Sequence, residues 1–382
     1  MKRPVLCGLI GLLLCACATV GEPETPDTQP DDNQEVPSQP DKPDKPKPSV
    51  VKGLTVEAIV ERLGVGWNLA NTLDTPSADK TAWGNPPAQQ SIIDSVVAMG
   101  FTTLRVPVTW EFDMMADAPY TVDADYMDEV ERCVRMGYDR GMFVVLNTHN
   151  DFWVVPTYAA QDEVTPRLVA LWQQIAERFA DYDQRLIFEP LNEPHVVDGV
   201  DQWVGGSAEN RAVLNDYHVA VVEAVRQVGG FNAERAMMLC ALGATGHEVA
   251  LDGLVLPDDE QLIVSVHTYY PVSFCLGEVG CMEWGSDVDR RLLRQALTRI
   301  QAKVSGWGRP LVMGEFGSRN RQNLPDRLLH ADYYAAVAHE LGIPVMWWDN
   351  GSFSQFGLLD RKTGTWVFPS IAHAILDPAL EY

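Results

Sequence analysis

Two glutamates of this chain stand in sequence contexts that suit acid and base chemistry. Glu193 belongs to the stretch LIFEPLNEPH, in which Pro190 and Pro194 each fix their own φ and keep the preceding residue out of a helix. Glu315 belongs to MGEFG, where flanking glycines let the backbone come close to a substrate. A protonated and an ionised carboxyl together are the minimum equipment for hydrolysing a glycosidic bond. We therefore expect Glu315 to be the nucleophile and Glu193 the proton donor and, later, the base.

Other side chains with suitable chemistry stand at the ends of apolar runs that read as strands: Asn68, Arg105, His149, Asn192, His267, Tyr269 and Trp348. Arg105 and Tyr269 could donate hydrogen bonds that keep Glu315 ionised. Asn192 could hold the 2-hydroxyl of a sugar. Taken singly, these residues have simpler interpretations, such as a structural ion pair for Arg105, satisfied barrel histidines, or a core position for the tryptophan. Their joint occurrence at successive strand ends favours a site.

Strand-like and helix-like runs alternate from Val51 onward. The strands are short, apolar and mostly non-alternating, which is typical of parallel strands buried on both faces. We expect strands at residues 63–69, 102–108, 142–147, 186–188, 236–242, 262–267, 310–313 and 345–348, and helices at residues 88–99, 123–140, 165–182, 210–228, 288–304, 327–341 and 369–376. Such units form either an open doubly wound sheet or a closed barrel. Eight units without a GxGxxG turn favour an α/β fold of one domain, a (β/α)8 TIM barrel, whose strand ends share one face.

The N-terminal segment has the composition of an export signal followed by a linker. A basic start and the apolar run Val5 to Leu14 predict a signal peptide over residues 1–16. The sequence around Cys17 resembles a lipobox, so we expect a lipid on this cysteine; an ordinary cleavable signal is the alternative. Residues 17–50 predict an acidic, Pro-rich disordered tether, and residues 51–382 the catalytic domain. These features predict an exported lipoprotein of a bacterial outer membrane or cell surface, attached to the membrane only through its N-terminal lipid.

Charge and cysteine usage limit the partners. The chain of 382 residues carries 53 acidic and 29 basic residues, a net charge of −24. This balance argues against nucleic acid and is compatible with a neutral polymer. Cys275 and Cys281, close together in a glycine-containing loop, could form a disulfide, whereas Cys133 and Cys240 are expected as buried free thiols. The cysteines lack paired CxxC spacing, and the His-Glu pair at residues 247–248 lacks a second histidine, so we expect no metal and no cofactor.

Eight motifs occur in order along the predicted domain: GWNLANTLD (66–74), AWGNP (82–86), GFTTLRVPVTW (100–110), VVLNTHND (144–151), LNEP (191–194), VHTYYP (266–271), GEFG (314–317) and WWDNG (347–351). Together they resemble glycoside hydrolase family 5, and most closely its subfamily 4 endoglucanases. The resemblance implies a (β/α)8 barrel that acts with retention of configuration. It also implies Glu193 as acid/base and Glu315 as nucleophile, with these further active-site positions: Arg105, His149, Asn192, His267, Tyr269 and Trp348.

Two positions depart from the family pattern. Ala70 stands where the family usually has a glycine, which could crowd the backbone near the cleft but spares Asn68 and Asn71. Asn150 stands where the family's HHD has its second histidine. An amide can donate and accept hydrogen bonds but carries no charge. The change to Asn150 bears on sugar contacts near the cleavage point rather than on the two-glutamate chemistry.

Aromatic residues in or beside loops could stack on sugar rings: Trp83, Trp153, Tyr158, Trp203, Trp284 and Trp348. We expect at least half of them to line an open cleft that cleaves a long chain internally; folded-back loop anchors are the alternative. The substrate-binding candidates are Asn68, Asn71, Trp83, Asn150, Trp153, Trp203 and Trp348. The resemblance implies a retaining endo-β-1,4-glucanase, with a β-glucan polysaccharide (soluble cellulose, mixed-linkage glucan or xyloglucan) as partner, and we expect a monomer. A mannanase or xylanase with the same mechanism and a catalytically dead surface glycan-binding protein are the alternatives.

Overall fold

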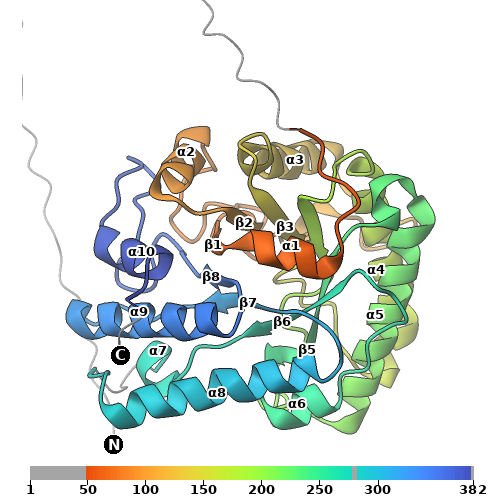
Figure 1. The fold of residues 1–382 in the computed structure, drawn as a ribbon. Coiled ribbons are helices and arrows are strands. Elements are labelled where there is room, and N and C mark those ends of the chain that lie inside the picture. Colours follow the sequence, from red (N-terminus) through yellow and green to blue (C-terminus); the bar gives the residue numbers. More distant parts are fainter. Residues whose placement is uncertain (1–48, 278–281, 380–382) are drawn as a thin grey trace, which may run out of the picture. The chain divides into compact units, whose positions relative to one another are not determined.

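The computed structural model describes residues 49–277 and 282–379. Its eight strands form a closed barrel in which every strand is parallel to its neighbours in chain order and β8 pairs with β1 (Figure 1). The strands are β1 (Val65–Asn68), β2 (Thr103–Val106), β3 (Phe143–Asn147), β4 (Leu186–Glu189), β5 (Met237–Thr245), β6 (Leu262–His267), β7 (Leu311–Phe316) and β8 (Val345–Trp347). The predicted (β/α)8 barrel is therefore confirmed.

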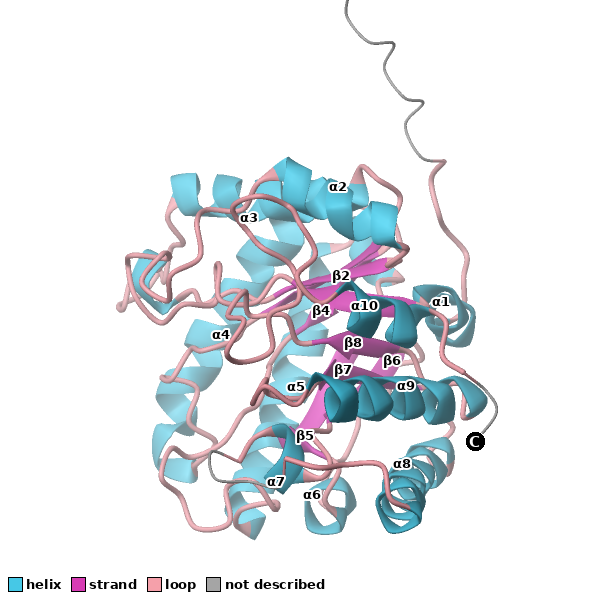
Figure 2. Ribbon diagram, turned by 90° about the vertical axis from the view of Figure 1, so that its left-hand side faces the viewer, coloured by secondary structure: helices cyan, strands magenta, loops and turns pink. Residues whose placement is uncertain are grey.

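Helices cover the outside of the barrel (Figures 1 and 2). They are α1 (Val56–Leu63), α2 (Gln90–Met99), α3 (Ala124–Tyr138), α4 (Tyr158–Arg178), α5 (Ala208–Val228), α6 (Glu248–Asp252), α7 (Val272–Cys275), α8 (Asp287–Ser305), α9 (Leu324–Glu340) and α10 (Pro369–Leu376), with short 3-10 turns at Glu111–Asp113 and Gly230–Ala233. Two long helices begin with capping boxes, Ser207 with Asn210 before α5 and Ser286 with Asp289 before α8. Each box satisfies backbone N–H groups that the first turn leaves unpaired, which fixes where the helix begins.

The alternation of side chains along each strand divides the apolar core into two parts. Outward side chains such as Trp67 and Phe188 pack with the surrounding helices. Inward side chains such as Val145 and Ile187 form a second cluster inside the barrel, and α1 buries an apolar stripe in it: Val56, Ile59, Val60 and Leu63. Helix α1 therefore closes the N-terminal end of the barrel, and the long loops gather at the opposite end (Figure 2).

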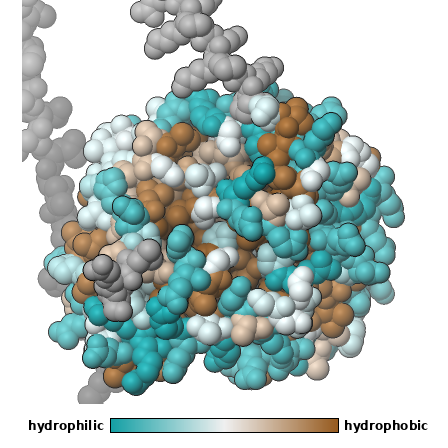
Figure 3. All heavy atoms as spheres, in the orientation of Figure 1, coloured by the Kyte–Doolittle hydropathy of each residue, from teal (hydrophilic) through white to brown (hydrophobic). Residues whose placement is uncertain are grey.

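The face of the molecule drawn in Figure 3 lies on the α1 side. A hollow of about 310 Å³ opens there between α1, α9 and α10, with Val60, Ile343 and Ile375 in its lining. Hydrophobic side chains gather in this part of the face, and hydrophilic ones surround them (Figure 3). The strand-end residues expected to do chemistry lie at the other end of the barrel.

Several element bounds differ from those predicted. Helix α1 is absent from the sequence prediction, which assigns a strand from residue 63. Helix α4 begins at Tyr158 rather than at residue 165, and it carries Pro166 in its interior. Strand β5 extends to Thr245 through an irregular register after Cys240, and β7 extends to Phe316. The two extensions carry backbone beyond the regular ladder and into the barrel mouth.

The structure confirms the prediction for two of the cysteines. Cys133 and Cys240 are buried free thiols, as expected. Cys275 is also buried as a free thiol, and its Sγ lies 3.5 Å from His330 Nε2. Its expected disulfide partner, Cys281, lies outside the described residues, so this pairing stays a prediction.

The predictions for the N-terminal segment cannot be compared with the structure. Cys17, the signal peptide, the tether up to residue 48 and Cys281 lie outside the described residues. No helix within residues 49–277 and 282–379 is both long enough and apolar enough to span a membrane.

Candidate active site

Arg105 is the polar centre of the barrel mouth. Strand β2 directs its side chain into the barrel, where it is fully buried. Its Nε donates to Glu189 Oε2 at 2.6 Å, and its Nη1 donates to Glu315 Oε1 at 2.7 Å. Nη1 also donates to Asn68 Oδ1 at 2.9 Å, and Nη2 donates to Asn192 Oδ1 at 2.7 Å. The guanidinium is thus both a structural ion pair and a support for the predicted nucleophile.

Glu315 lies on β7 with both carboxylate oxygens bonded. Oε1 accepts from Arg105, and Oε2 accepts from the Tyr269 hydroxyl at 2.8 Å. The preceding Gly314 is required by close approach, because a Cβ there would lie 2.9 Å from His267 Nε2. Burial raises the pKa of Glu315, while the charges of His267 and Arg105 and the hydrogen bond from Tyr269 act against that rise. These contacts favour the ionised form that a nucleophile needs.

Glu193 projects from the loop after β4, and a quarter of its side chain, 25%, is exposed. Its Oε1 accepts a hydrogen bond from His267 Nδ1 at 2.7 Å. Carboxylate oxygens of Glu193 and Glu315 lie within 4.8 Å of each other. Retaining glycosidases hold their carboxyls about 5–5.5 Å apart and inverting ones about 6.5–9.5 Å apart. The observed separation leaves no room for a water between the pair, which is the arrangement of a double displacement.

His267 lies between the two glutamates at the end of β6. Burial lowers its pKa, but the charge of Glu315 and the carboxylates of Glu189 and Glu193 outweigh burial and raise the pKa to about 9. Among the described residues, the ligand atoms of Glu193, His267 and Glu315 are close enough to hold a metal ion. A metal would have to displace the proton of His267 and compete with Arg105 for Glu315, so the donor set favours hydrogen bonding between these groups.

His149 and Trp348 form one wall of the site. Their rings stack at 5.4 Å between centroids. Asn147 Nδ2 donates to His149 Nδ1 at 3.0 Å, and Asn192 Nδ2 lies 3.4 Å from His149 Nε2. Burial lowers the pKa of His149 well below its ordinary value, and the charges of Arg105 and His267 lower it further. The imidazole is therefore neutral and offers hydrogen bonds rather than charge.

A cleft of about 780 Å³ runs over these groups. Its lining includes most of the residues predicted for the site: Asn71, Trp83, His149, Asn150, Asn192, Glu193, Trp203, His267, Tyr269, Glu315 and Trp348. Trp83 is 47% exposed and Trp203 is 48% exposed, so each presents a ring face to solvent in the cleft. Three of the six loop aromatics thus line the cleft, as expected.

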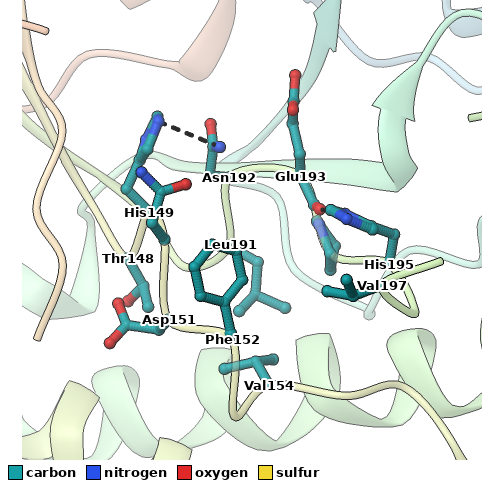
Figure 4. A pocket seen from close by; sticks show the side chains of 12 residues that line it. Thr148, His149, Asp151, Phe152, Val154, Leu191, Asn192, Glu193, His195 and Val197 are labelled. Atoms are coloured by element: carbon teal, nitrogen blue, oxygen red, sulfur yellow. Dashed lines mark hydrogen bonds between the residues drawn. The ribbon is translucent and has the colours of Figure 1, made fainter. Parts of the chain in front are cut away.

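A smaller side pocket opens from the cleft beside the acid/base candidate. Figure 4 shows Asn192 and Glu193 at one side of this pocket and Phe152, Val154 and Leu191 at the other. The pocket joins the loop after β3 to the loop after β4. Both loops therefore shape the space next to Glu193.

Three aromatic residues and one asparagine that were expected at the substrate do not line the cleft. Asn68 is fully buried below Arg105, and its Nδ2 donates to the backbone carbonyls of residues 314 and 347, so it positions strands. Trp153 lies under the Arg167 guanidinium, 4.2 Å from the ring centroid, and donates from Nε1 to Asp151. Trp284 is buried against α9. Tyr158 is exposed at the start of α4, away from the cleft lining.

Asn150 occupies the position of the missing histidine and holds two loops together. Its Nδ2 donates to the backbone oxygen of Asp74 at 2.8 Å. This bond links the loop after β3 to the loop after β1, on which Asn71 lines the cleft. The amide replaces the missing histidine with a neutral contact between loops.

Glu189 is the main residue that the sequence interpretation missed. It is fully buried, and besides Arg105 it accepts from Asn147 Nδ2 at 3.2 Å and Ser265 Oγ at 3.3 Å. Burial opposes its ionisation, but the charge of Arg105 and the contact with His267 lower its pKa to about 2. The sequence does contain an indication of this residue. Glu189 is charged and stands two positions after Ile187 in a buried strand, so its side chain must face the barrel interior like that of Ile187.

Fold and site together define a class of protein: an α/β barrel whose mouth carries a close pair of carboxylates in an open cleft lined by aromatics, as in glycoside hydrolases. The chain belongs to the cellulase family, glycosyl hydrolase family 5, whose family model matches residues 66–354.

Known relatives cover most of this chain. Cellulase/esterase CelE of Acetivibrio thermocellus is 41% identical over 83% of this chain. The matched part makes up only 40% of the length of that relative. Endoglucanase B of Clostridium cellulovorans is 38% identical over 85% of the chain and 76% of its own length. A solved GH5-4 broad-specificity endoglucanase from Ruminococcus champanellensis with bound cellotriose has a TM-score of 0.83 at 36% identity, covering 85% of this chain and 99% of that one.

Proposed function

We propose that this protein is a retaining endo-β-1,4-glucanase that hydrolyses internal bonds of soluble β-glucans. The observation that carries the proposal is the pair Glu193 and Glu315, whose oxygens lie within 4.8 Å in an open cleft. The names of the relatives support the substrate class, since they include endoglucanases and an endoglucanase structure that holds cellotriose.

The contacts assign a role to each group. Glu315, fixed on both oxygens, attacks the anomeric carbon while Glu193 gives its proton to the departing glycosidic oxygen. Glu193 then takes a proton from water, which attacks the glycosyl–enzyme bond and frees Glu315. Asn192 accepts from Arg105 on Oδ1, and its Nδ2, with one hydrogen directed to His149, has a second hydrogen to donate to a sugar hydroxyl. His149 and Trp348 supply the wall against which the reacting ring packs.

The placement of the exposed tryptophans supports internal cleavage. Trp83 shares the cleft with Asn350, near β1 and β8, while Trp203 lies by Thr245, near β4 and β5. The closed strand order puts these pairs of strands on opposite sides of the barrel mouth. Aromatic platforms on both sides of the glutamates suit a chain that extends past the cleavage point in both directions.

Reducing-end release from mixed-linkage β-glucan, xyloglucan and mannan, measured side by side, tests this function. Glu193→Gln and Glu315→Gln are the blanks, since each keeps the side-chain volume and removes the acid. Release from a glucan that both variants abolish supports the proposal. Release from mannan alone would keep the mechanism and refute the substrate. Binding without release from any polymer would show a glycan-binding protein.

We further propose that the protein is a lipoprotein of the bacterial outer membrane or cell surface, anchored through Cys17. The apolar run that ends in Leu14-Cys15-Ala16-Cys17 supports this location. Replacement of Cys17 by alanine should move the protein from the membrane fraction to the soluble fraction. Retention of the variant in the membrane fraction would refute the anchor.

A further inference from the structure

Glu189 contacts the groups that hold both reacting glutamates, yet it lies outside the cleft. Its carboxylate is fully buried beneath Arg105 and is absent from the cleft lining. Oε2 accepts from Arg105 Nε at 2.6 Å, and Oε1 lies 3.8 Å from His267 Nε2. That imidazole nitrogen is buried and has no hydrogen-bond partner among the described residues. Arg105 in turn bonds Glu315, and His267 bonds Glu193.

The charges around this carboxylate form an alternating chain. Glu193 contacts His267, His267 faces Glu189, Glu189 contacts Arg105, and Arg105 contacts Glu315. The two cations lie between three carboxyls, so each of the buried carboxyls Glu189 and Glu315 has a cationic partner, and His267 is the partner of Glu193. Buried ions of one sign are stable only when such partners balance them.

The other titratable groups that face Glu189 do not alter this balance. His149, on the loop after β3, is neutral because burial lowers its pKa well below the ordinary value. Cys240 on β5 keeps its thiol proton, since burial and the nearby carboxylates raise its pKa. Arg105, His267, Glu193 and Glu315 are the charged or acidic groups already described.

We propose that Glu189 is a positioning residue for the hydrolysis: from below the cleft, it orients Arg105 against Glu315 and His267 against Glu193. This inference rests on the proposed glycosidase function and deepens it. Without the Glu189 carboxylate, Arg105 keeps one anionic partner, Glu315, instead of two. Its guanidinium can then turn away from the orientation in which it holds Glu315 for attack. His267 also loses one of the charges that keep its proton.

The test compares Glu189→Gln, Glu189→Asp and wild-type protein. In Glu189→Gln we expect kcat on mixed-linkage β-glucan to fall about tenfold or more with KM within about twofold, as for loss of a charged hydrogen bond. The pKa of His267, followed by the NMR shifts of its imidazole and assigned by their loss in His267→Ala, should fall by about one unit or more from its value near 9.

Glu189→Asp separates position from charge. The aspartate keeps the negative charge, but its shorter side chain places the carboxylate farther from Arg105 by about one carbon–carbon bond. We expect a lower kcat with a His267 pKa close to that of wild type. If Glu189→Gln does not fold, a Glu189→Asp protein that hydrolyses glucan as fast as wild type would overturn the proposal.

Asp183→Asn is the matched control, since it breaks a buried pair with Arg185 at the start of β4, away from the cleft. Its Tm should fall while kcat per folded molecule stays unchanged. The proposal is wrong if Glu189→Gln keeps wild-type kcat and His267 titration, or if both variants lose activity only in proportion to their unfolded fraction. An inactive wild type would instead refute the glycosidase function itself.

Discussion

Tyr269→Phe isolates one contact of the proposed nucleophile. The hydroxyl donates to Glu315 Oε2 at 2.8 Å, and the ring also packs against Phe356 at 5.7 Å between centroids. Burial and the charge of Glu315 raise the pKa of Tyr269 well above its ordinary value, so the hydroxyl keeps its proton and stays a donor. Phenylalanine removes this donor and leaves the ring packing in place.

The expected loss follows from the strength of that bond. A hydrogen bond to a charged group contributes about 1.5–3 kcal/mol, which corresponds to roughly 10- to 150-fold in rate if the bond acts in the transition state. Because the bond from Tyr269 opposes the rise in the pKa of Glu315, its removal raises that pKa further. The nucleophile must be ionised, so the acidic limb of the profile of kcat/KM against pH should move to higher pH.

The assay is initial-rate hydrolysis of soluble mixed-linkage β-glucan from pH 4 to 9, with Tm recorded at each pH. Tyr217→Phe is the control, because its hydroxyl donates to the backbone oxygen of Val155 at 2.9 Å and lies outside the cleft lining. Activity of Tyr269→Phe within twofold of wild type, with an unmoved acidic limb, would refute the role assigned to this contact.

Three further results are expected. Glu315→Ala should hydrolyse almost no polymer, and azide should restore turnover of an aryl cellobioside to a glycosyl azide of inverted configuration; a product of retained configuration would contradict the nucleophile assignment. Trp203→Ala should raise KM for the polymer by about 2- to 10-fold with kcat unchanged, because one stacking platform is lost; an unchanged KM would remove Trp203 from the binding surface. Burial raises the pKa of Asp151 to about 7. The native carboxyl therefore binds its proton more tightly than the unfolded one, so this stabilisation is complete below about pH 4 and is lost as the pH rises toward 7, by up to roughly 4 kcal/mol. Urea unfolding of Asp151→Asn should show a weaker decline over this range, and an equal decline would contradict the prediction.

The barrel was predictable because its evidence is local and repeated. Each strand is a short apolar run beside a helix that carries an apolar stripe. Eight such strand–helix units are compatible with few folds. Helix α1 carries an equally clear stripe, from Val56 through Ile59 and Val60 to Leu63, with Thr55 as its cap. Nothing near it in the sequence indicates that this stripe packs against the open end of the barrel, so the sequence alone does not predict the helix that closes it.

The site was predictable where residues follow a strand and less so where burial decides their role. Glu193, Tyr269 and Glu315 follow predicted strands, and they meet in the cleft. Glu189 is the last residue of a strand, and only its alternation with Ile187 indicates that it faces the barrel interior. Trp153 stands in a loop like the cleft tryptophans, and no nearby residue indicates that Arg167, on α4, covers its ring.

The closed end of the barrel sets a limit on how far the chain can be shortened. Hydrogen bonds to the start of β4 begin just before α1: the N–H of Val51 donates to Asp183, and Leu54 both donates to Gln184 and accepts from it. Proteases that digest the acidic segment should therefore stop near residue 50 on the folded protein. Removal of α1 as well would open the inner cluster to water, and the strand that ends in Glu189 would lose the contacts that fix its beginning.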